Sequence, residues 1–121
     1  HNGRRRQRQM CIRDRGLAEG MHFSEKAGLN SKDVLEVISK GAAQSWQMEN
    51  RWQTMLEDEF DHGFAVDLMR KDLDIVIKKA EYENISLEVT KIVNDYYKEI
   101  QKSGGGKWDT SSLYKRLKDN L

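Results

Sequence analysis

The sequence predicts an all-α fold, and three of its features point to helices. The residues Val66, Met69, Leu73, Val76 and Ala80 follow one another at steps of three and four, which places them on one face of a helix. No segment alternates apolar and polar residues for long enough to form a strand. The chain holds nine glycines and no proline, so we expect helices that end at glycine.

Six helices are expected, at about residues 17–27, 31–41, 43–56, 66–84, 87–102 and 109–117. Leu17 and Met21 of the first helix face inward, with Phe23 as a further candidate, and Gly28 ends this helix. Either Asn30 or Ser31 caps the second helix.

The two longest predicted helices of the second half carry the broadest apolar faces. Leu68, Ile75 and Ile77 widen the stripe of the 66–84 helix, so we expect this helix to be covered on more than one side. The 87–102 helix is expected to bury Val89, Ile92, Val93, Tyr96 and Ile100 and to stop in the three glycines at 104–106.

The net charge of +1 is distributed unevenly along the chain. Residues 1–15 hold six arginines, one acidic residue and no lysine. Residues 10–15, Met-Cys-Ile-Arg-Asp-Arg, resemble the translation of a transposon-end adapter used to prepare sequencing libraries. We therefore divide the chain into a non-native or disordered head, 1–15, and a domain, 16–121. An arginine-rich arm that binds nucleic acid is the less favoured alternative.

The sequence contains almost no recognisable catalytic motif, and no metal site is expected. Gly104, Gly105 and Gly106 lack the spacing of a phosphate-binding loop. His22 and His62 have no paired ligand at zinc spacing, and the acidic residues near Asp58 are interpreted as a solvated loop.

Cys11 is the only cysteine, which suits a reducing compartment, and no membrane span or secretory signal is recognised. A cytoplasmic protein is expected.

Two features leave alternatives open on spacing alone. Lys71 and Asp72 lie near the edge of the apolar stripe of the 66–84 helix, where they form either an exposed charged face or a contact to a ligand. In the segment 40–46, small residues lead to Trp46 at a helix start, and one alternative is that backbone N–H groups there face a bound anion. Packing of Trp46 into the core is the favoured interpretation of that segment.

Several motifs, taken together, resemble the C-terminal helical domain of the β-hydroxyacid dehydrogenases, the family of 3-hydroxyisobutyrate dehydrogenase and 6-phosphogluconate dehydrogenase. The motifs are Gly-Leu-Ala-Glu-Gly at 16–20, Lys-Gly-Ala-Ala-Gln-Ser-Trp-Gln-Met-Glu-Asn-Arg at 40–51, Gly-Phe-Ala-Val-Asp-Leu-Met-Arg-Lys-Asp-Leu at 63–73, and Trp-Asp-Thr-Ser-Ser-Leu at 108–113. They occur in the expected order across residues 16–121.

The resemblance implies a two-domain enzyme whose Rossmann domain is missing from this chain. That domain binds NAD or NADP, and hydride passes between the nicotinamide and a small β-hydroxy acid such as 3-hydroxyisobutyrate. The family's catalytic lysine lies on the helix that joins the two domains, and residues 1–15 contain none. The chain is therefore expected to be an inactive fragment without a catalytic residue, taken from an enzyme that forms a homo-oligomer.

Four positions carry a role over from the family. Lys71 matches the lysine that reaches the cofactor near the nicotinamide ribose, and Asp72 matches the neighbour that holds this region. Trp46 stands where the helical domain borders the substrate pocket, and Phe64 matches an aromatic residue that closes the cleft. The alternative function is a stand-alone helical module that pairs through an apolar face and has no catalytic activity.

Overall fold

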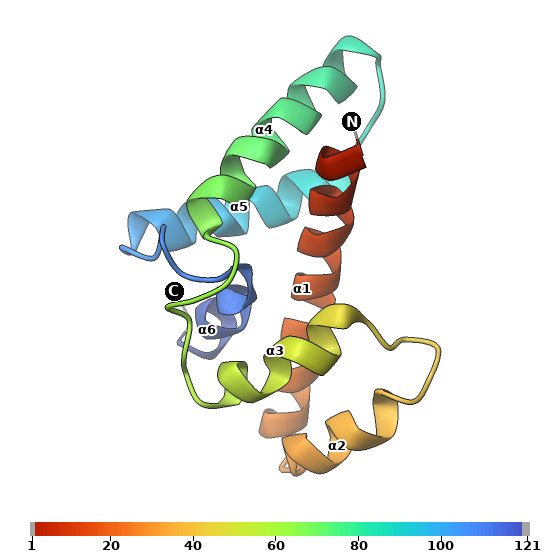
Figure 1. Ribbon diagram of the computed structural model, residues 1–121, viewed down its shortest axis with the longest axis vertical. Helices are drawn as coiled ribbons and strands as arrows, with labels where there is room; N and C mark the ends of the chain where they lie inside the picture. Colours follow the sequence, from red (N-terminus) through yellow and green to blue (C-terminus); the bar gives the residue numbers. More distant parts are fainter. Residues whose placement is uncertain (1, 120–121) are drawn as a thin grey trace.

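The protein is described from a computed structural model that covers residues 2–119, with side chains from residue 8 onward. The described residues form six α-helices and one short 3₁₀-helix (Figure 1). These elements are α1 (Asn2–Lys26), α2 (Ser31–Ile38), α3 (Trp46–Leu56), α4 (Val66–Tyr82), α5 (Glu88–Lys102), η1 (Thr110–Ser112) and α6 (Leu113–Lys118). The only pairing of strand type within residues 2–119 is an isolated bridge between Ala65 and Asp109, so the prediction of an all-α fold is confirmed.

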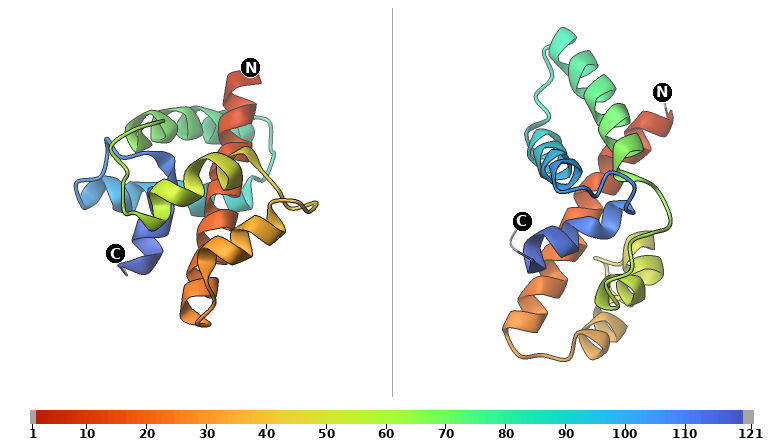
Figure 2. Two further views of the ribbon diagram at one scale, coloured as in Figure 1. Left: turned by 60° about the horizontal axis from the view of Figure 1, so that its bottom comes forward. Right: turned by 90° about the vertical axis from the view of Figure 1, so that its left-hand side faces the viewer.

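Helix α1 is the axis on which the domain is built. Its first half packs against α4 and α5, while α2 and α3 lie against its second half, as the views in Figures 1 and 2 show. Helix α6 also packs along α1. The core formed by these contacts is rich in methionine and tyrosine, with Met21, Met55, Met69, Tyr97 and Tyr114 all buried.

The first helix begins earlier than the sequence indicated. Helix α1 starts at Asn2, and within the arginine-rich stretch both Cys11 and Asp14 are buried in the core. The structure thus has a helix where we expected a non-native or disordered head, because this stretch continues the register of Leu17 and Met21 along α1. Whether residues 1–15 are native stays a prediction.

The apolar stripe of α4 is confirmed in part. Val66, Met69, Leu73 and Ala80 are buried, and Val76 is half-buried. Leu68 is exposed, and Ile75 and Ile77 are half-buried, so the expectation that α4 is covered on several sides is wrong for its first turn.

Helix α5 buries a different face from the one expected. Val93 and Ile100 are buried as predicted and Tyr96 is half-buried, but Val89 and Ile92 are exposed. The buried positions also include Thr90, Asn94 and Tyr97. The Asn94 side chain donates to Asp74 and accepts from Arg70, at 3.0 Å in each case, so polar bonds to α4 turn this face of α5 inward. Phe23 of α1, 72% exposed, likewise does not face the core.

The triple glycine closes α5 and supports the start of α4. Gly104 adopts a positive φ of 95°, the left-handed conformation that follows many helices. A side chain at Gly105 would collide with the Trp108 ring. The carbonyl oxygens of Gly106 and Trp108 each accept a bond of 2.8 Å from the first N–H groups of α4, those of Asp67 and Val66. The segment is a close-packed helix stop.

Candidate functional site

The loop that carries Phe64 is held by a buried carboxylate, that of Asp109. Its Oδ1 accepts from the Phe64 N–H at 2.8 Å, and its Oδ2 accepts from Arg51 Nε at 3.0 Å. The same Oδ2 accepts from the Ser111 N–H at 3.1 Å and from the Ser111 hydroxyl at 2.5 Å. Two backbone bonds complete the attachment, from the Asp109 N–H to the Phe60 carbonyl and from the Thr110 N–H to the Phe64 carbonyl. The position of Phe64 is therefore determined by Asp109.

Trp46 lies at the start of α3 and is 53% exposed, so the interpretation of Trp46 as a core residue is wrong. The Arg51 guanidinium stacks on the Trp46 ring, 4.7 Å from its centroid, while the same arginine bonds to Asp109. The neighbours Gln47 and Met48 take the buried positions instead, because they follow Trp46 onto the inner face of α3.

The start of α3 is already stabilised by its own residues. The Ser45 hydroxyl accepts from the Met48 N–H at 3.1 Å, and Glu49 places a negative charge in the first turn. An anion at this helix start would therefore meet a satisfied amide and a carboxylate, which argues against the anion alternative for the 40–46 segment.

Lys71 and Asp72 lie in the second turn of α4. Lys71 is exposed, Asp72 is half-buried, and neither forms an ion pair with the side chains of residues 8–119. Several other charged groups of α4 are paired. Arg70 bonds to Asp74 and to Gln101 of α5, both at 2.9 Å, and Asp67 accepts from Gln101 at 2.7 Å. The hydrogen bond from Gln101 lowers the pKa of Asp67, and the hydrogen bond and positive charge of Lys107 lower it further.

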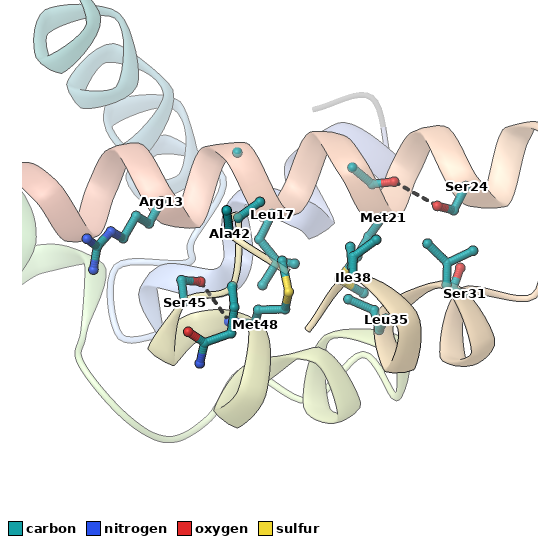
Figure 3. Close-up of a pocket in the computed structure, with 15 residues that line it drawn as sticks. Arg13, Leu17, Met21, Ser24, Ser31, Leu35, Ile38, Ala42, Ser45 and Met48 are labelled. Carbon is teal, nitrogen blue, oxygen red and sulfur yellow. Dashed lines mark hydrogen bonds between the residues drawn. The ribbon is translucent and has the colours of Figure 1, made fainter. Parts of the chain in front are cut away.

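Of the four predicted site residues, the structure links two. Trp46 and Phe64 are joined through Arg51 and Asp109, residues that the sequence analysis did not assign to the site. Both Arg51 and Asp109 stand within the family motifs, and Asp109 also caps η1, where its side chain accepts from the Ser111 N–H. No hydrogen bond, ion pair or cation–π contact joins Lys71 or Asp72 to that group within the described residues. The segment 42–45 instead borders a cavity between α1, α2 and α3 (Figure 3).

Three buried groups near the middle of α1 have unusual ionisation. Burial raises the pKa of Asp14 to about 7, although bonds from Thr110 and Tyr97 oppose the shift. Burial also raises the pKa of Tyr97 well above its usual range and that of the Cys11 thiol to about 12. A thiol with such a pKa stays protonated at neutral pH, so Cys11 is unsuited to act as a nucleophile.

Across residues 2–119, no three His, Cys, Asp or Glu side chains gather into a group that could hold a metal ion. None of the helices in the same stretch is long and apolar enough to cross a membrane.

Several known proteins resemble this chain in sequence and in fold. The family described as "NAD-binding of NADP-dependent 3-hydroxyisobutyrate dehydrogenase" matches residues 12–117. An uncharacterized oxidoreductase of Shewanella frigidimarina is 53% identical over 111 residues, which cover 90% of this chain and 38% of that protein. A cytokine-like nuclear factor, N-PAC of Anopheles gambiae, is 34% identical over 103 residues, which cover 85% of this chain and 18% of that protein.

A solved structure, 3-hydroxyisobutyrate dehydrogenase from Salmonella typhimurium, superposes with a TM-score of 0.85 at 26% identity. The match covers 93% of this chain and 40% of that one. The chain thus spans about two fifths of the length of the oxidoreductases it matches. By sequence and by fold, it belongs to the family of the helical NAD-binding domain of 3-hydroxyisobutyrate dehydrogenase.

Proposed function

We propose that this chain supplies the helical half of an NAD(P)-dependent dehydrogenase that oxidises a small β-hydroxy acid such as 3-hydroxyisobutyrate. The observation that carries the proposal is the family match over residues 12–117, which includes all four candidate site residues. A dinucleotide-binding domain would bind most of the NAD or NADP, and the nicotinamide would supply the hydride chemistry.

The surface of α4 fits a contact to the cofactor. The Lys71 ammonium is exposed and has no ion pair with the described side chains, so it is available to ribose or phosphate oxygens. Asp72 beside it offers a carboxylate acceptor to ribose hydroxyls. These two residues would hold the cofactor from the side of the helical domain.

Trp46 and Phe64 would border the substrate. Both are aromatic and not fully buried, and the Arg51–Asp109 pair connects their two segments. A wall of this kind, fixed from behind by a buried carboxylate, selects a substrate by the shape of its apolar part.

This chain would be inactive alone, because its first lysine is Lys26 and the family's catalytic lysine has no counterpart before it. We attribute this to a non-native stretch at residues 1–15. One observation supports that attribution: Asp14 is 2% exposed and has no ion-pair partner among the side chains of residues 8–119, although Tyr97 donates a hydrogen bond to it. An unpaired charge in a core is expensive, and native cores rarely retain one.

The first test is to re-read the DNA upstream of the Gly16 codon from a library made without the adapter. A reading frame that continues into a lysine-bearing helix, and further upstream into a glycine-rich turn after a strand, supports the proposal. Confirmation of the arginine-rich stretch behind a start codon would overturn it for this molecule.

The second test is a lysine replacement in the restored full-length protein. Lys71→Ala should raise the cofactor KM by about tenfold or more and leave the substrate KM nearly unchanged, because a charge-assisted bond to the cofactor is lost. Lys78→Ala, an exposed lysine farther along α4, is the matched control and should change neither constant. Equal kinetics for the two variants would remove Lys71 from the site.

A second candidate function is a non-catalytic pairing module, from which a homo-oligomer would also follow. Exposed apolar side chains at the α4–α5 junction favour it, namely Tyr82, Ile85, Val89 and Ile92. The similarity to a protein named as a nuclear factor shows that this domain is not confined to proteins named as oxidoreductases. If the restored protein oxidises a β-hydroxy acid, the enzyme is the correct function and the non-catalytic module is not.

A cytoplasmic location stays a prediction.

A further inference from the structure

A cavity of about 470 Å³ lies between α1, α2, the 39–45 segment and the start of α3. Figure 3 shows its apolar middle, where Leu17 and Met21 of α1 face Leu35 and Ile38 of α2 and Met48 of α3. None of the four candidate site residues lines it, so it is separate from the proposed dehydrogenase site. Its volume falls within the range of pockets that bind small molecules.

Two glycines open the α1 wall of this cavity. Gly16 and Gly20 are one helical turn apart and therefore lie on the same face of α1. A Cβ atom at either position would meet no other atom within 4 Å, so close packing does not require glycine there. Glycine inside a helix is less stable than alanine, and these two positions keep the hollow open at that cost.

One end of the cavity is polar. Ser31 is only 9% exposed, and its Oγ is buried without a hydrogen-bond partner among the described residues. Ser24 lies at the same end in Figure 3, and its hydroxyl donates to the Gly20 carbonyl at 3.0 Å, which leaves its oxygen able to accept. An unsatisfied buried hydroxyl is unfavourable, and a ligand group at this end would satisfy it.

The charge of the lining limits the class of ligand. Arg13 is the single charged residue among the lining residues, and it lies at the end opposite the two serines. A charged group held at the serine end would be desolvated without a partner. We propose that this cavity binds an uncharged small molecule with an apolar body, whose one hydroxyl or carbonyl group hydrogen-bonds to Ser31.

The test compares p-cresol with p-xylene, which have similar shape but differ by the hydroxyl group. Each is titrated into the 121-residue protein, and binding is followed by amide chemical shifts in two-dimensional NMR spectra. Both compounds should cause saturable shifts at Gly16, Gly20, Leu35 and Met48. The p-cresol should bind about threefold to tenfold more tightly, the value of one added hydrogen bond.

Two variants and a control assign the site. Ser31→Ala should abolish the preference for p-cresol, whereas Ser103→Ala at the end of α5, which does not line the cavity, should keep it. Gly20→Leu should fill the cavity and remove binding of both compounds, with circular dichroism as the check on its fold. If Gly20→Leu does not fold, Ser31→Ala decides the question.

Shifts that do not saturate, or that fall outside the cavity, would overturn the proposal. An unchanged preference in Ser31→Ala would do the same. Because the cavity proposal is independent of the dehydrogenase proposal, loss of ligand binding here and normal cofactor use by the restored protein can be observed separately.

Discussion

At the scale of single residues, Asp109 is the acidic residue that holds the segments of the candidate site together. It is 1% exposed and accepts from Arg51, from the Phe64 N–H and from two groups of Ser111. Its bonds connect α3, the loop before α4, and η1, which are distant along the chain. Removal of its charge should therefore loosen three segments together.

The variant Asp109→Asn tests this role. It keeps the size of the side chain but replaces one acceptor oxygen by an NH₂ group and leaves Arg51 without its carboxylate. The free energy of unfolding should fall by about 1.5–3 kcal/mol, the range for hydrogen bonds to charged groups, as measured by urea denaturation. Asp119→Asn removes a partly exposed ion pair with Lys115 and should cost less than about 1 kcal/mol. A similar loss in both variants would contradict the proposed role.

At the scale of the elements, the glycines divide into two kinds with opposite predictions. Gly20→Ala should stabilise the protein by about 0.5–1 kcal/mol, because alanine favours the helix and its Cβ enters open space. Gly105→Ala should destabilise it by about 1–3 kcal/mol, because the new Cβ overlaps Trp108 and Ile100 in a packed turn. Thermal unfolding followed by circular dichroism measures both changes. A rise in the melting temperature for Gly105→Ala would show that the turn can relax.

The elements also show how far the sequence predicts this structure. The α4 stripe was predictable because Val66, Met69 and Leu73 face a core directly, where apolar spacing determines the buried face. The face of α5 was not, because Asn94 is turned inward by bonds to Arg70 and Asp74 on another helix. Polar partners of this kind depend on tertiary contacts and leave no periodic signal.

The candidate site shows the same limit. Family motifs marked Trp46, Phe64, Lys71 and Asp72 as candidates, but the motifs alone did not show how they are held. The bond between Arg51 and Asp109 joins residues 58 positions apart, and no local spacing rule relates them. Exposure of Trp46 follows from its stacking on Arg51, which keeps the ring at the surface. Its apolar character alone had favoured the core.

At the scale of the whole molecule, the buried Asp14 should make stability depend on pH. Its pKa is about 7 in the folded protein, while an aspartate in an unfolded chain titrates near the ordinary value of about 4. The folded state therefore holds the proton more tightly. The contribution of the Asp14 carboxyl to the free energy of unfolding is fully present below about pH 4 and is lost as the pH rises through 7. The loss approaches about 4 kcal/mol, a large part of the stability of a small domain.

The variant Asp14→Asn removes this ionisation and keeps the size of the side chain. Urea denaturation between pH 4 and 9 should show a decline in the free energy of unfolding for the parent protein and a much flatter profile for the variant. The variant should exceed the parent by several kcal/mol above pH 7, since no charge then has to be buried beside Tyr97 and Asp109. Asp95→Asn, at an exposed position of α5, is the control and should retain the parent profile. A parent protein equally stable at pH 5 and pH 9 would mean that Asp14 ionises without a folding cost. Asp14 would then be suited to its core position and would no longer support a non-native origin of residues 1–15.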